Sequence, residues 1–262
     1  MMSSDLTGAR LELRQRLGAG ARYDSSAAPA AELRYARLGT AYFARKLNEL
    51  SDGELALPSL VPGWTRRHVI AHVGFQARAL ARLVEAARLG RRREMLEEPE
   101  AQNEDIAFGA SLPAHALRYL FKHSQVHLDV EWRDLDEAGW RAQVEPLNGG
   151  LVEIAQTPWL RTREIWLRAV DLDNGASLLD VPSEVVDRLL REAAQALDMR
   201  GQPFSLTLKP TDRVASIVIG SGKNTVSGTA VDLLRWLTGR GPRRSLVFDR
   251  EIADPPFWPE KP

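Results

Sequence analysis

The chain has 262 residues, of which 44% are hydrophobic, so it is long enough to bury one large core or two smaller ones. Its 35 basic and 35 acidic residues give a formal net charge of zero, which argues against a dedicated nucleic-acid-binding protein. The absence of cysteine excludes disulfides and a thiolate nucleophile from the chain itself, so any thiol chemistry requires an external thiol.

The first residues predict an extension and not a targeting segment. Residues 1–30 are rich in Ala, Ser, Gly and Arg and contain no long apolar run, so we expect a short helix followed by a loosely structured lead-in. No stretch of the chain approaches the ~20 apolar residues that a membrane-spanning helix needs. We therefore expect a cytoplasmic protein without a membrane partner.

Helical patterns dominate the next part of the chain, residues 31–175. Amphipathic periodicity predicts four long helices, over about 31–50, 65–89, 113–133 and 157–172. The charged linker between the second and third of these predicts no more than a short helical turn. Helices of this length joined by loops are typical of a four-helix bundle.

The pattern changes in the last part of the chain, residues 176–262. An amphipathic helix, PSEVVDRLLREAAQALDM, precedes three strand-like runs, FSLTLKP, RVASIVIG and NTVSGTA. A helix, AVDLLRWLTG, and a possible edge strand, SLVFDRE, follow them. Strands that come only after a run of helices indicate a second, α+β domain.

Two pairs of histidines stand four residues apart, in HVIAH and HSQVH, which places both imidazoles of a pair on one side of a helix. This spacing is compatible with a metal site and equally with histidines at the boundary of a core. In the first pair, the helical periodicity places His72 at the edge of the apolar face and His68 further out. His72 is therefore the member expected to point into a bundle.

Charged residues form a stripe along the predicted helix at 157–172, made by Arg161, Glu164, Arg168 and Asp171. By itself this pattern is typical of a solvated face, with Glu164 and Arg168 as a favourable i, i+4 pair. Further along, Gly239 and the Gly-Pro pair after it end a helix, so Arg240 is expected on a loop. Such an arginine complements a helix dipole or offers a bidentate fork to a carboxylate.

The chain resembles the mycothiol-dependent maleylpyruvate isomerase family from about residue 32 to its end. Five stretches carry the resemblance in order and spacing: ARLGTAYFARKL, LPSLVPGWTRRHVIAHVGFQARAL, NEDIAFGASLPAHALRYLFKHS, TPWLRTREIWLRAVDL and VSGTAVDLLRWLTGRG. The resemblance implies an N-terminal DinB-like four-helix bundle and a small C-terminal α+β domain similar to sterol-carrier folds. It also implies an enzyme of aromatic catabolism that uses mycothiol to convert maleylpyruvate into fumarylpyruvate.

A metal, usually zinc, is part of what the resemblance implies, bound by a His of the second helix and by a Glu and a His four residues apart on the fourth. His72 and Glu164 match the first two ligands, but Arg168 stands at the third position. The family's catalytic arginine matches Arg240. Because a guanidinium has no lone pair to give a metal, we expect zinc to bind weakly or not at all. The alternative is that another ligand is recruited, from His68, His127 or Asp171.

On this basis Arg168 is expected to replace part of the metal's electrostatic role, by pairing with Glu164 or by holding an anionic thiol or substrate group. Arg240 is expected to hold a substrate carboxylate and to stabilise the developing enolate. The expected partners are a small acid and a low-molecular-weight thiol. Two alternatives stay open: a mycothiol S-transferase-like enzyme for another electrophile, and a non-catalytic protein that binds a small thiol or acid.

Overall fold

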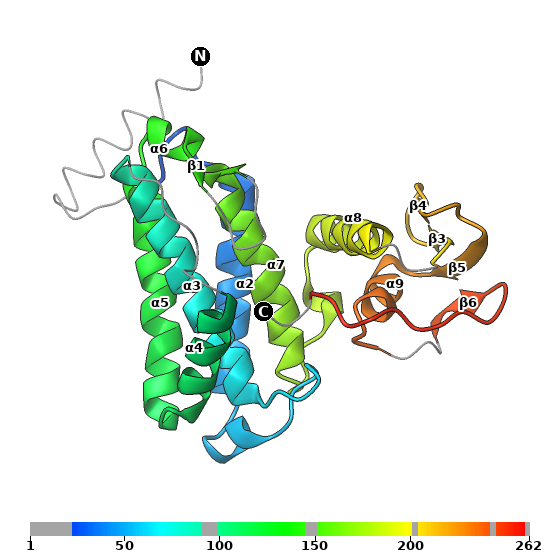
Figure 1. The fold of residues 1–262 in the computed structure, drawn as a ribbon, viewed down its shortest axis with the longest axis horizontal. Helices are drawn as coiled ribbons and strands as arrows, with labels where there is room; N and C mark the ends of the chain where they lie inside the picture. The colour runs from blue at the N-terminus through cyan, green and yellow to red at the C-terminus, as the bar shows by residue number, and fades with distance from the viewer. Residues whose placement is uncertain (1–22, 91–98, 145–150, 201–203, 242–244, 260–262) are drawn as a thin grey trace.

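The protein is described from a computed structural model, over residues 23–90, 99–144, 151–200, 204–241 and 245–259. A long helical part and a smaller mixed part lie side by side, and helix α7 of the first faces α8 of the second (Figure 1). Of the predicted N-terminal extension, residues 1–22 lie outside the described residues. In the described ranges, no helix is both long and apolar enough to span a membrane.

The helical part is built on α2 (Ala30–Asn48), α3 (Arg66–Arg88), α5 (Ala114–Asp134) and α7 (Thr157–Asp171). The closest pairs are α3 with α5 and α2 with α7, and α3 also touches α7. The four helices coincide with the four predicted from periodicity, and their ends differ by at most two residues. The predicted helical bundle is thus confirmed.

Shorter elements in this part were not predicted. Helix α4 (Pro99–Ser111) occupies the charged linker where only a turn was expected. It is stabilised by packing on α3, where Gly109 lies so close that an added Cβ would be 2.7 Å from Ala71 Cβ. Helix α6 (Glu137–Arg141) and the antiparallel strands β1 (Gln143–Val144) and β2 (Val152–Glu153) follow α5. Short 3₁₀ turns are η1 (Gly53–Ala56), η2 (Ile154–Gln156) and η3 (Leu178–Asp180).

The mixed part begins with α8 (Ser183–Met199) and continues with β3 (Leu206–Pro210), β4 (Ile217–Ile219), β5 (Asn224–Gly228), α9 (Ala230–Leu237) and β6 (Val247–Phe248). The sheet has the order β4-β3-β5-β6, in which β3 and β5 are parallel and the outer pairs are antiparallel. Strand β6 lies at an edge, as predicted, and α8 packs on α9. The predicted small α+β domain is confirmed.

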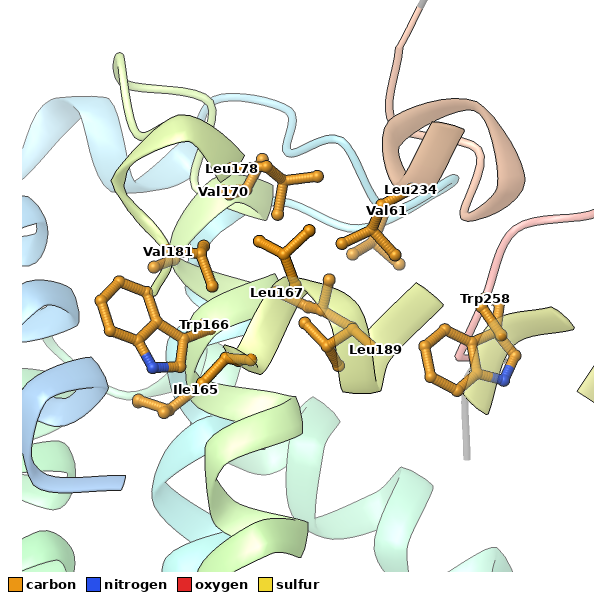
Figure 2. Packing of buried hydrophobic residues seen from close by; sticks show 14 of the residues in the cluster. Val61, Ile165, Trp166, Leu167, Val170, Leu178, Val181, Leu189, Leu234 and Trp258 are labelled. Carbon is orange, nitrogen blue, oxygen red and sulfur yellow. The ribbon is translucent and has the colours of Figure 1, made fainter. Parts of the chain in front are cut away.

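One hydrophobic cluster continues from the bundle into the α+β part. Figure 2 shows Leu167 of α7 close to Val61, to Leu189 of α8 and to Leu234 of α9. None of these four side chains is more than 1% exposed. Since α7 packs on both parts of the molecule, its charged face is held at their junction.

Candidate active site

The charged stripe of α7 is buried, so its interpretation as a solvated face is wrong. Arg161 and Arg168 are each 1% exposed, Glu164 is 6% exposed and Asp171 is fully buried. The cover comes from α3 and from the loop after α9, which are distant in sequence. The charge pattern of one helix cannot show that other segments bury it. The family resemblance, in contrast, implied that this face of the helix points into the bundle.

His72 of α3 meets Glu164 of α7 within the protein. Its Nε2 lies 3.1 Å from Glu164 Oε2, and its ring lies 5.6 Å from that of Trp64. The Nδ1 atom is buried and has no hydrogen-bond partner in the described part of the chain. Burial lowers the pKa of His72, although the hydrogen bond with Glu164 opposes this shift. The imidazole is therefore neutral at physiological pH.

Glu164 is held by cations on both of its oxygens. Arg168 Nε donates to Oε2 at 3.2 Å, and Arg163 Nε donates to Oε1 at 3.2 Å. Burial by itself raises the pKa of Glu164, but Arg168, His72 and Arg163 together outweigh it and hold that pKa well below its usual range. Glu164 is consequently a buried carboxylate that stays ionised.

Asp171 joins the bundle to the loop that carries Arg240. Arg168 Nη1 donates to Asp171 Oδ2 at 3.0 Å. Arg240 donates to the same carboxylate from Nε at 2.8 Å and from Nη2 at 2.9 Å, a bidentate arrangement. A buried chain of alternating charge thus runs from Glu164 through Arg168 and Asp171 to Arg240.

The end of α9 places Arg240 at this junction. The helix ends at Leu237, Gly239 adopts a φ of 73°, and the Arg240 N–H donates to the carbonyl oxygen of Arg235 at 2.7 Å. Glycine is the residue that best tolerates this left-handed conformation at a helix end. Arg240 therefore lies on a loop, where the sequence predicted it.

The two arginines differ in how many donors remain unused, given that a guanidinium has five N–H groups. Arg240 uses four of them, two on Asp171 and two from Nη1 on the carbonyl oxygens of Thr238 and Trp258. Arg168 uses two, on Glu164 and Asp171, so three have no partner in the described ranges. The capacity to hold an additional anion is therefore greater at Arg168.

The donor set does not fit the three-ligand zinc site that the resemblance implies. His72 and Glu164 are close enough to share an ion, but Arg168 Nε donates to the same Glu164 oxygen that faces His72. Zinc sites in proteins use three or four Cys, His, Asp or Glu ligands. Within the described residues, no three such side chains gather in a group that could hold a metal.

The possible replacement ligands are engaged elsewhere. His68 Nδ1 lies 2.8 Å from Thr65 Oγ1 at the start of α3, where it caps the helix. His127 Nε2 lies 3.5 Å from Glu131 Oε1 along α5. Asp171 is taken by two arginines, as described above. A metal-ligand role for these three residues has no support in their geometry.

A contact between Glu192 of the second domain and the bundle is among those that sequence reasoning missed. Arg163 Nη1 donates to Glu192 Oε1 of α8 at 2.6 Å, and Trp159 Nε1 donates to Glu192 Oε2 at 2.8 Å. Glu192 thereby fixes the arginine that contacts Glu164. No sequence signal identified it, because a glutamate on an amphipathic helix is ordinarily a surface residue.

Fold and site together define a two-domain protein with a buried ionic site between a helical bundle and an α+β domain. The chain belongs to the mycothiol maleylpyruvate isomerase family. Residues 36–173 match the mycothiol maleylpyruvate isomerase N-terminal domain and residues 180–255 match the MDMPI C-terminal domain. The family predicted from the sequence is thus confirmed.

Solved structures give the same result. The chain in a crystal structure of the mycothiol-dependent maleylpyruvate isomerase is 36% identical in sequence to this protein. The chain in a crystal structure of a histidine-to-alanine mutant of that enzyme is 35% identical. Each match has a TM-score of 0.83 and covers 87% of this chain and 96% of the other. No match is found among curated proteins.

Proposed function

We propose that this protein is a thiol-dependent cis–trans isomerase that converts maleylpyruvate into fumarylpyruvate, with mycothiol as cosubstrate. Family membership supports the thiol and the substrate class. The observation that carries the proposal is the buried cluster at the domain junction, where Arg168 keeps unused N–H groups near a neutral His72. The absence of cysteine in the chain agrees with a thiol supplied from outside.

The proposed reaction leaves the thiol unconsumed. The thiolate adds to one carbon of the cis double bond, and the π electrons move into the conjugated carbonyl as an enolate. The former double bond is then single and rotates. Collapse of the enolate re-forms the double bond in the trans geometry and expels the thiolate.

Three side chains of this protein are assigned parts in that reaction. Arg168 holds the thiolate and lowers the pKa of the thiol through its positive charge. Neutral His72 accepts the thiol proton as a general base and returns it to the expelled thiolate at the end of the cycle. Arg240 stabilises the substrate carboxylate or the enolate with its remaining N–H group.

An absorbance assay with maleylpyruvate and mycothiol tests the isomerase activity. We expect turnover by the unmodified protein and a decrease in kcat/KM of ~100-fold or more in both Arg168→Gln and Arg240→Ala, because each removes a donor to developing negative charge. The control is Arg213→Ala, whose guanidinium pairs with Asp187 and Asp212 at the surface. Intact ligand binding without turnover would instead favour a non-catalytic protein, and turnover only with another electrophile would favour an S-transferase.

We propose further that the site binds zinc weakly or not at all. Elemental analysis of the purified protein should find well under one zinc per chain, and Arg168→His should raise the content towards one, since it completes a His–Glu–His set. Adding Glu164→Gln to that variant should remove the zinc again. One tightly held zinc per chain in the unmodified protein would refute the proposal.

A further inference from the structure

Arg161 is a buried charge that the proposed reaction does not use. Its side chain donates from Nη1 to the carbonyl oxygen of Val73 at 2.8 Å and to Gln76 Oε1 at 2.7 Å. Among the described residues its Nε and Nη2 are buried and have no hydrogen-bond partner, and no carboxylate lies in salt-bridge contact with it, although the charge of Glu164 on the same helix partly offsets the effect of burial. Burial lowers the pKa of Arg161 to about 9, so the group is still charged at neutral pH. An unpaired buried cation is costly, which calls for an anionic partner.

Arg161 lines a groove of about 440 Å³ between α2 and α5. This volume lies within the ~300–1,000 Å³ typical of small-molecule sites. The walls are largely apolar, with Ala41 and Ala44 from α2 and Val126 and Trp132 from α5. The groove opens between two helices that are not among the closely packed pairs of the bundle.

The charge of the groove favours an anion. Its lining holds three arginines, at positions 37, 133 and 161, and one acid, Asp129. Arg37 and Arg133 both pair with Asp129, at 2.7 and 2.9 Å, and Arg37 also pairs with Asp24 at 2.6 Å. The rim arginines are thereby neutralised. Arg161, the most buried of the three, is the one that forms no salt bridge with an acid in the described part of the chain.

We propose that this groove binds an apolar carboxylic acid, whose carboxylate accepts hydrogen bonds from Nε and Nη2 of Arg161 and whose hydrocarbon part lies between α2 and α5. Those two nitrogens form one edge of the guanidinium fork, which matches a carboxylate in a bidentate geometry. The apolar walls suit a hydrocarbon or aromatic tail. His72, Glu164, Arg168, Asp171 and Arg240 do not line the groove, so the site is separate from the proposed isomerase centre.

A comparison of octanoate with octan-1-ol separates the contribution of the carboxylate to binding from that of the hydrocarbon tail. With the full-length protein at pH 7.5, each is titrated against a bound fluorescent probe, 8-anilinonaphthalene-1-sulfonate. We expect octanoate to bind at least about tenfold more tightly than the alcohol, the increment of one charge-assisted bidentate pair. In Arg161→Met, which replaces the guanidinium by an apolar side chain of similar length, this preference should disappear. Equal affinity for acid and alcohol, or unchanged octanoate binding by Arg161→Met, would overturn the proposal.

A second variant tests the location without touching the arginine. Ala41 is exposed and lines the groove, so Ala41→Trp should fill it and abolish octanoate binding. The matched control is Leu38→Trp, since Leu38 is 44% exposed on the same helix but does not line the groove. Octanoate binding that survives Ala41→Trp places the acid elsewhere and refutes the site. Turnover of maleylpyruvate by Ala41→Trp should stay at the level of the unmodified protein, which keeps the two proposals distinguishable.

Discussion

Asp171, the last residue of the charged stripe on α7, holds two arginines of the site in place. It is fully buried and accepts hydrogen bonds from Arg168 of its own helix and from Arg240 of the other domain. One carboxylate thus compensates two buried guanidinium groups. An asparagine there would keep the shape and lose the charge, so Arg240 would lose its carboxylate partner and would face Arg168, which would keep only its bond to Glu164.

We expect Asp171→Asn to lower the free energy of unfolding by about 3–5 kcal/mol, the usual effect of removing one partner from a buried ion pair. Urea denaturation followed by circular dichroism measures the change. The control is Asp173→Asn, the same replacement two positions along at an exposed residue, which should stay within about 0.5 kcal/mol of the unmodified protein. Similar losses in both variants would show that the two arginines do not depend on Asp171.

The sequence predicted part of this cluster. His72, Glu164 and Arg168 came from a family pattern that spans two helices, and the structure brings them together. The bond between Asp171 and Arg240 was missed because it joins residues 69 positions apart in different domains. Neither helical periodicity nor local spacing carries information about such a contact.

At the scale of elements, Tyr42 ties α2 to the segment between α7 and α8. Its hydroxyl donates to Asp180 Oδ2 at 2.6 Å and accepts from the Ser177 N–H at 3.1 Å. Burial, followed by the hydrogen bond to Asp180, raises the pKa of Tyr42 to about 12. The folded state therefore favours the neutral phenol more strongly than the unfolded chain does.

This shift makes a contribution to stability that depends on pH. Below pH 10.0, the ordinary pKa, the phenol is neutral in both states and its stabilisation is complete; as pH rises from 10.0 towards about 12, the unfolded state ionises first and the stabilisation is lost. We expect Tyr42→Phe to cost about 1 kcal/mol at pH 8, with the deficit shrinking above pH 10. Denaturant unfolding across this range measures it.

Tyr119→Phe provides the comparison, because Tyr119 is 65% exposed. The difference in unfolding free energy between this variant and the unmodified protein should be near zero at pH 8. A deficit of Tyr42→Phe that stays constant from pH 8 to pH 12 would contradict the assignment of the shift to this hydroxyl.

Length and periodicity explain which elements were predictable. The four bundle helices are long enough for their apolar faces to be unambiguous. Helix α4 was not recognised, because its sequence has almost no amphipathic periodicity and its stability comes from packing on α3. The two-residue strands β1 and β2 are too short to show an alternating pattern.

At the scale of the whole molecule, the shared hydrophobic cluster couples the two domains. Leu167, fully buried at their junction, packs with residues from both (Figure 2). We expect Leu167→Ala to lower the free energy of unfolding by about 2–5 kcal/mol, because it leaves a cavity that both domains line. Circular dichroism and tryptophan fluorescence should report one common transition.

Leu179→Ala is the control for this prediction, since Leu179 is 74% exposed and is the second residue of the turn η3 that links the two domains. Its effect should stay within about 0.5 kcal/mol. Two separate transitions in Leu167→Ala, one for each domain, would show that the cluster does not couple them.

The ion pair between Asp171 and Arg240 has a consequence for exchanging the domains of this protein. Asp171 lies in the segment matched by the N-terminal family domain and Arg240 in the segment matched by the C-terminal one. A hybrid of this bundle with a relative's second domain would leave Asp171 with Arg168 but without its second guanidinium partner, unless an arginine stands at the turn equivalent to that of Arg240. The reciprocal hybrid would bury an arginine without its acid. We therefore expect this chain to exchange a domain without loss of stability only with a relative that preserves both halves of this pair.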